Sequence, residues 1–143
     1  MKLILVSLII LLISQSVKFF VFLYRGGKIS SNSLFWNYLW AGKFPSTHMA
    51  IMGGAIYTIW YENGPDLLFG LGIILTGIVF YILIENKKRY KLLEAYYSKS
   101  EDKSIRGIVN DGKLQEFEGH SAVEIISGFL LGLLVAFVYN IYV

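Results

Sequence analysis

The chain has 143 residues, of which 55% are hydrophobic and only 16% are charged, and it carries a net charge of +3. Soluble domains contain about 25% charged residues, so this composition cannot cover a soluble surface, and it also excludes intrinsic disorder. The absence of cysteine excludes a disulfide scaffold, thiolate metal sites and a cysteine nucleophile. Because the apolar residues occur in blocks separated by charged segments, the chain reads as a multi-span membrane protein.

The first apolar block covers residues 3–24 and predicts a transmembrane helix, since at about 1.5 Å per residue it crosses a hydrocarbon core of about 30 Å. A signal peptide beginning at Lys2 is the alternative. Apolar sequence resumes over residues 19–24, which favours the membrane helix. Gln15 and Lys18 are three residues apart and therefore share a helix face, and a lysine at this depth should point into the protein or reach an interface.

Three further blocks complete the predicted fold, which is an all-α integral membrane bundle of four transmembrane helices in a single domain, residues 1–143. Pro45 suits a helix start, and Gly53 and Gly54 permit close helix contact. Gly128 and Gly132 have the GxxxG spacing, which more often reflects general packing than a dimer face. The predicted helices after the first are residues 45–61, 67–84 and 121–142.

The connections set the orientation. Residues 25–44 hold three basic residues and an aromatic run expected at the membrane interface, and the long polar third connection, 85–119, holds eight more basic residues. The first part of that connection is expected to extend the third helix into water. The positive-inside rule places both connections in the cytoplasm and both termini outside, in what we expect to be the plasma membrane of a prokaryotic cell. The sequence has no basic stripe interleaved with aromatic residues, so nothing in it predicts nucleic-acid binding.

The two histidines of the chain, His48 and His120, each open a predicted helix, and the topology puts both at the same side of the membrane. Helix N-termini offer free N–H groups and a positive dipole end, so they suit an anion such as phosphate. Glu124 lies four residues after His120, so its carboxylate can accept the ring N–H and leave the other ring nitrogen as a nucleophile.

Two alternatives stay open at this point. A histidine at a membrane interface is often only an amphipathic anchor, and the dipole favours a glutamate in the first turn of a helix regardless of chemistry. The set of His48, His120 and Glu124 also resembles a catalytic zinc triad in ligand type, although no outer carboxylate is evident to support it.

The segments Pro45-Ser46-Thr47-His48 and Gly119-His120-Ser121-Ala122-Val123-Glu124 resemble two signatures of the type 2 phosphatidic acid phosphatase superfamily. The small size, the four spans and Gln15-x-x-Lys18 resemble its divergent branch more closely. The resemblance implies a metal-independent histidine phosphatase without a cofactor, in which His120 is the nucleophile, His48 the general acid and Glu124 the orienting group. It further implies phosphate binding by Ser46 and by basic residues, for which the candidates are Lys18, Lys43, Lys87 and Lys88.

The chain departs from the family pattern at its basic and acidic positions. Leu114 stands where the larger superfamily has an arginine, and Ile82 lies near the position of an aspartate in the divergent branch. Lysines replace paired arginines after the third helix, and lysine supplies charge without the bidentate fork of arginine.

The expected function is hydrolysis of a lipid phosphate or prenyl diphosphate at the cytoplasmic interface, through a phosphohistidine intermediate. Two hypotheses from other classes remain. One is a membrane protein that keeps the fold and an anion-binding pocket without turnover. The other is a small transporter subunit, in which Lys18 and Glu124 would form an intramembrane ion pair.

Overall fold

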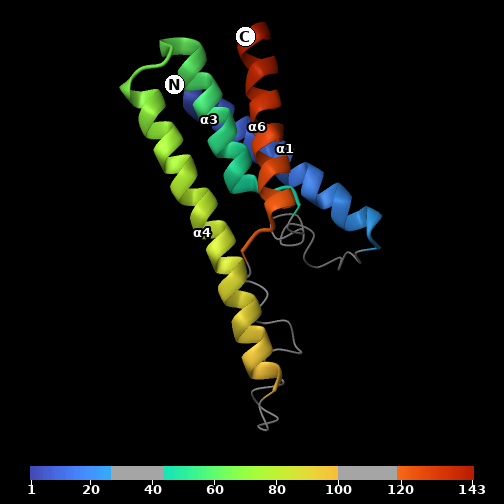
Figure 1. Cartoon of the computed structure of the whole chain (residues 1–143). Helices are drawn as coiled ribbons and strands as arrows, with labels where there is room; N and C mark the ends of the chain where they lie inside the picture. Colours follow the sequence, from blue (N-terminus) through green and yellow to red (C-terminus); the bar gives the residue numbers. More distant parts are fainter. Residues whose placement is uncertain (27–43, 100–118) are drawn as a thin grey trace.

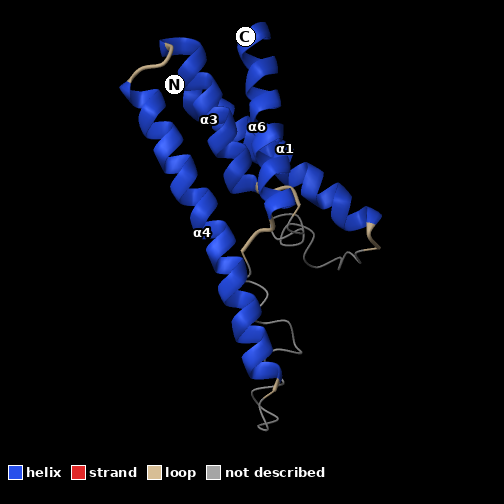
Figure 2. Cartoon of the chain, in the orientation of Figure 1, coloured by secondary structure: helices blue, strands red, loops and turns tan. Residues whose placement is uncertain are grey.

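A computed structural model describes residues 1–26, 44–99 and 119–143, and these parts of the chain are helical without any strand (Figure 2). The all-α class is therefore confirmed. The aromatic run of the first connection, Lys43 and most of the third connection lie outside the described residues. The helices are α1 (Lys2–Tyr24), α3 (Thr47–Asn63), α4 (Leu67–Ser98) and α6 (Ala122–Tyr142).

Within the described parts, α1, α4 and α6 are long and apolar enough to cross a membrane, as expected of an integral membrane protein. Helix α3 has 17 residues, which is at the lower end of the range of about 17–25 that spans a bilayer. Helix α4 has 32 residues and continues through the polar segment to Ser98, so at about 1.5 Å per residue it is longer than the hydrocarbon core. About 20 residues suffice to cross that core, so the polar final turns of α4 are not needed for a span.

Helix α3 is the centre of the bundle and packs on α6, α1 and α4, while α1 also touches α6. Among the described residues, α4 has no comparable contact with α6 or α1. Figure 1 shows that α3 and α6 begin at the same end of the bundle, and that the C-terminus and the turn between α3 and α4 lie at the other end. The buried core joins the three central helices through Val6, Ile10, Ala50 and Ala136.

Small residues let α3 and α6 approach until their backbones touch. A Cβ atom on Gly128 would collide with the carbonyl oxygen of Ser46, and one on Gly132 would collide with that of Ala50. Gly53 meets α6 in the same way, because a Cβ there would lie 2.5 Å from the carbonyl oxygen of Phe129. The GxxxG spacing of Gly128 and Gly132 thus serves packing within the chain, as is common where apolar helices pack in lipid.

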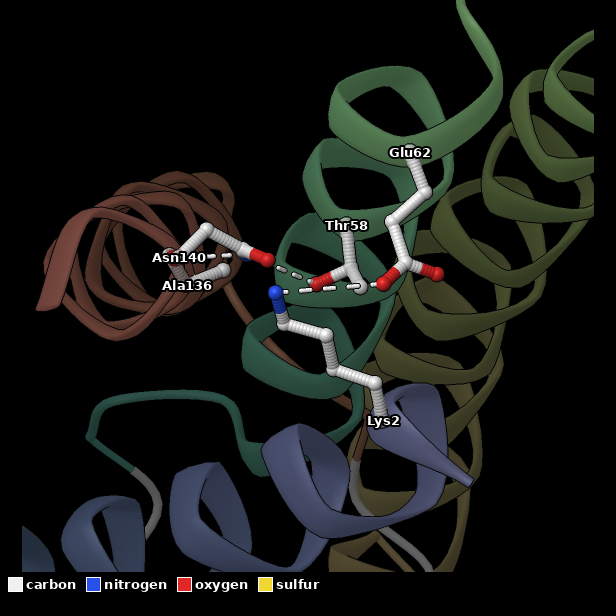
Figure 3. Close-up of polar contacts among 5 residues, drawn as sticks. All are labelled: Lys2, Thr58, Glu62, Ala136 and Asn140. Atoms are coloured by element: carbon white, nitrogen blue, oxygen red, sulfur yellow. Dashed lines mark hydrogen bonds and ion pairs between the residues drawn. The ribbon is translucent and has the colours of Figure 1, made fainter. Parts of the chain in front are cut away.

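Polar contacts hold the far end of the same three helices together (Figure 3). Asn140 of α6 is buried and its Nδ2 donates to Thr58 Oγ1 on α3 at 3.4 Å and to the carbonyl of Ala136 at 2.8 Å. Lys2 of α1 reaches Glu62 of α3, with 3.8 Å between Nζ and Oε1. These contacts cross from α1 to α3 and from α3 to α6, so they set the helix positions at the end opposite the two histidines.

Candidate functional site

The two histidines meet where α3 and α6 begin. His48 is the second residue of α3, and His120 precedes the N-cap of α6. Their ring centroids are 6.1 Å apart and the ring planes are inclined by 69°. His48 is exposed and His120 is half-buried, with both ring nitrogens of His120 buried. The prediction that both histidines lie at one end of the bundle agrees with this placement.

The N-terminus of α3 has no side-chain cap among the described residues. Its N-cap, Ser46, has an extended backbone and makes no side-chain cap, so the first N–H groups of the helix lack the usual side-chain acceptor. The Ser46 side chain is fully buried, and its Oγ has no hydrogen-bond partner among the described residues. A buried hydroxyl without a partner is costly, and a ligand that bonds it removes that cost.

Close contact with α6 holds the N-terminus of α3 in place. The N–H of Ser46 donates to the carbonyl oxygen of Glu124 at 2.9 Å, and Gly128 leaves room for the Ser46 backbone. Helices α3 and α6 are therefore joined by a backbone hydrogen bond at the level of the histidines. This bond fixes the distance between the two helix starts without using any side chain that the chemistry needs.

Glu124 closes the first turn of α6. Its Oε2 accepts the N–H of Ser121 at 2.7 Å, and Ser121 Oγ accepts the N–H of Glu124 at 3.3 Å, which is a complete capping box. The carboxylate thereby stabilises the helix start beside His120. The predicted contact between this carboxylate and the His120 ring is not among the described hydrogen bonds and stays a prediction.

Helix α1 supplies the positive charge of the site. Lys18 is half-buried, and its ammonium group is close enough to interact electrostatically with the Glu124 carboxylate and the His48 ring. One turn earlier on the same face, Gln15 Oε1 accepts a hydrogen bond from Thr47 Oγ1 at 3.5 Å. This contact joins α1 to the start of α3, one turn from Lys18.

Helix α4 holds His120 from the other side. The N–H of His120 donates to the carbonyl oxygen of Leu83 at 3.2 Å. A Cβ atom on Gly119 would collide with the same carbonyl and lie 2.6 Å from the backbone nitrogen of Lys87. Only glycine allows the chain to approach α4 this closely just before the histidine.

The other predicted phosphate-binding lysines are placed differently. Lys87 is half-buried and its backbone adjoins Gly119, beside the site, whereas the neighbouring Lys88 is exposed. Lys43 lies outside the described residues. Over the described ranges, no three His, Asp, Glu or Cys side chains converge in a way that could hold a metal ion.

The motifs around both histidines, and the helices that carry them, fall within a single family match. The family model described as the divergent PAP2 family matches residues 1–135. The chain belongs to the divergent PAP2 family. The resemblance predicted from the sequence is confirmed. No curated protein and no solved structure matches the chain.

For this member of the divergent PAP2 family, the structure adds residues that sequence reasoning did not place. Gln15 was noted for its position beside Lys18, but its bond to Thr47 was not expected. The carbonyl of Leu83 carries no sequence signal, because any residue type presents the same acceptor. The face of α3 that packs on α6 does have a sequence signal. Small or polar residues recur every four positions, at Ser46, Ala50, Gly54 and Thr58.

Proposed function

We propose that this protein is a membrane phosphatase that hydrolyses a lipid phosphate or diphosphate through a phosphohistidine intermediate. The observation that carries the proposal is the pair of imidazole rings 6.1 Å apart beside the uncapped N-terminus of α3. Membership of the divergent PAP2 family supports a phosphatase-related fold. A phosphoryl group between the two rings would lie within reach of both, given attack distances of about 3–3.5 Å.

In the first step, a ring nitrogen of His120 attacks phosphorus, and the bond between phosphorus and the leaving oxygen breaks. His48, as imidazolium, donates its proton to that oxygen, and the lipid alcohol or the shorter phosphate leaves. In the second step, His48 accepts a proton from water, whose oxygen attacks phosphorus and breaks the P–N bond. Inorganic phosphate is released, and both histidines return to their starting state.

The oxygens of the transferred group need fixed positive charge and hydrogen-bond donors. Lys18, the first N–H groups of α3 and the buried hydroxyl of Ser46 supply them. Such groups are already oriented before reaction, so they stabilise charge in the transition state without reorganisation. Lys87, whose backbone adjoins Gly119, is the candidate for a further positive charge.

The proposal includes the membrane topology. In addition to α1, α4 and α6, helix α3 also spans the membrane, with a length of about 25 Å for 17 residues at about 1.5 Å per residue. The basic end of α4 and the histidines face the cytoplasm, where the positive-inside rule puts them. A Ser98→Cys variant of this cysteine-free chain should react with an impermeant thiol reagent only when the cytoplasmic side is open. Labelling of intact cells would contradict this orientation.

The decisive experiment measures phosphate release by the purified protein in detergent from phosphatidate and from a polyprenyl diphosphate, with and without chelator. Release should survive the chelator and disappear in His120→Ala. Loss of release on chelation would favour the metal alternative. Binding of phosphate by a folded protein that releases none would favour the non-catalytic alternative.

A second measurement detects the intermediate. In His48→Gln, p-nitrophenyl phosphate should still phosphorylate His120, because nitrophenolate leaves without a proton. Water attack is then slow, so an acid-labile, base-stable phosphoprotein should accumulate. Its absence from both this variant and the wild type during turnover would contradict the covalent mechanism.

A further inference from the structure

An apolar cleft of about 290 Å³ opens between α4 and α6, with α3 as its floor. This volume is near the lower end of the range of about 300–1,000 Å³ for ligand pockets. Its one polar side chain, Thr76, donates its hydroxyl to the carbonyl of Gly72 at 2.8 Å and so is satisfied within α4. The cleft has no polar group that requires water or a polar ligand.

The cleft is open at the surface of the helix bundle. Helices α4 and α6 both pack on α3 but make no comparable contact with each other among the described residues. Ile126 and Leu130 on the α6 wall are about half exposed, at 52% and 57%. At membrane depth, water does not occupy such a space, so a hydrocarbon chain is the ligand that its walls favour.

The cleft also adjoins the candidate active site. Met49 of its floor follows His48 directly, and Ile125 of its α6 wall follows Glu124. Phe80 on the α4 wall lies one turn before Leu83, whose carbonyl holds His120. From that end the cleft extends by about 6–8 Å toward the middle of the bundle, the rise of about five helical residues.

We propose that this cleft receives one hydrocarbon chain of the lipid phosphate, which enters sideways from the bilayer between α4 and α6. The phosphate then lies at the histidines, and the chain lies along Phe80 and Gly77. This inference rests on the proposed function for the identity of the headgroup. The cleft itself selects for a long apolar chain, because its contacts are lost when the chain is short.

Gly77 provides a clean test. It lines the cleft, and a Cβ atom there would meet nothing within 4 Å, so Gly77→Leu adds a side chain to the open space without a backbone collision. Gly70 lies two turns away on nearly the same face of α4, is equally unobstructed and does not line the cleft. Gly70→Leu is therefore the matched control for any general effect of leucine on α4.

The expected result is a fall of about tenfold or more in kcat/KM for a long-chain phosphatidate in Gly77→Leu, of the size seen when pocket contacts with a few methylenes are lost. Turnover of p-nitrophenyl phosphate should be unchanged, and Gly70→Leu should match the wild type on both substrates. An equal loss on both substrates, or an unchanged kcat/KM for phosphatidate, would overturn the proposal.

A binding measurement separates this inference from the proposed function. A phosphatidate with a diazirine in one acyl chain, placed in phosphatidylcholine vesicles, should crosslink to peptides containing Phe80 or Ile126 in His120→Ala, which does not depend on turnover. Gly77→Leu should reduce that crosslinking at least threefold, and Gly70→Leu should not. Equal crosslinking by a phosphatidylcholine that carries the same chain would overturn the proposal and identify an ordinary boundary lipid.

Discussion

The glycines of α6 and those of α4 differ in their surroundings. On the α6 side, Gly128 and Gly132 bring the two backbones into contact, and no space is left for even a methyl group. On α4, Gly72 packs against α3, whereas Gly70 and Gly77 have nothing within 4 Å of the position of a Cβ. The comparison shows a closed face between α3 and α6, which fixes the distance between the two helix starts, and an open face of α4, of which Gly77 lines the cleft. Glycine content alone would not distinguish them.

The largest effect is expected at the closed face. Gly132→Leu should destabilise the protein by about 3 kcal/mol or more, because the new side chain collides with the backbone of Ala50 and the core cannot relax around it. Thermal unfolding in detergent, followed by size-exclusion chromatography, measures the loss. Gly70→Leu on the open face should unfold at or slightly above the wild-type temperature, since leucine favours helix over glycine. Similar losses in both variants would remove the distinction between the two faces.

The next effect is expected where the chain before α6 meets α4. Gly119→Ala should lower kcat for phosphate release by about 100-fold, because the methyl group displaces His120 from the Leu83 carbonyl and a shift of about 1 Å can have this effect. Gly72→Ala is the control, since its Cβ would lie at an ordinary 3.5 Å from Ile56 Cγ1. A fully active Gly119→Ala would show that this close approach does not position the histidine.

Glu124 allows its charge to be separated from its capping role. Glutamine also forms a capping box, so Glu124→Gln should unfold near the wild-type temperature. The activity of this variant should fall about tenfold, because Lys18 and the histidines lose a nearby negative charge. Glu124→Ala should lose both stability and activity. Wild-type activity in Glu124→Gln would assign the residue to helix capping alone.

The smallest effect is expected for Ser46→Ala. Its hydroxyl has no hydrogen-bond partner among the described residues, so its removal should leave stability unchanged or slightly raised. Inhibition by inorganic phosphate should weaken several-fold, as expected for one lost hydrogen bond of about 1 kcal/mol. Ser127→Ala, which removes a hydroxyl bonded to the Glu124 carbonyl, is the control and should not change inhibition. A stability loss without weaker inhibition would show that the hydroxyl serves packing.

Much of the fold follows from local sequence. Long apolar runs of membrane length predict α1, α4 and α6, and the pattern Ser121-x-x-Glu124 is a capping signal that marks where α6 begins. The membrane end of α4 was predicted near residue 84, and the helix itself continues to Ser98. Hydrophobicity reports where a helix leaves the lipid, whereas helix propensity decides where it ends, so the two boundaries differ.

The candidate site was only partly predictable. The alternation of spans placed His48 and His120 at one end, and shared helix faces linked Gln15 to Lys18. The contact between Gly119 and α4 and the route along Gly77 required the tertiary structure. Both depend on which faces of different helices meet. Residue spacing predicts which side chains share a face of one helix, but it does not predict which face of another helix packs against them.

The amino-acid sequence was enough to predict a helical membrane protein, its family, and the two helix starts that carry histidines. Helix packing was needed to reveal the 6.1 Å separation of the rings, the uncapped N-terminus of α3 and the side on which α4 leaves a cleft. The physical reason is that lipid and protein interior are equally apolar, so hydrophobicity does not say which helix face is covered. Backbone contact at small residues sets the rotation of each helix, and it becomes visible only when the helices are packed.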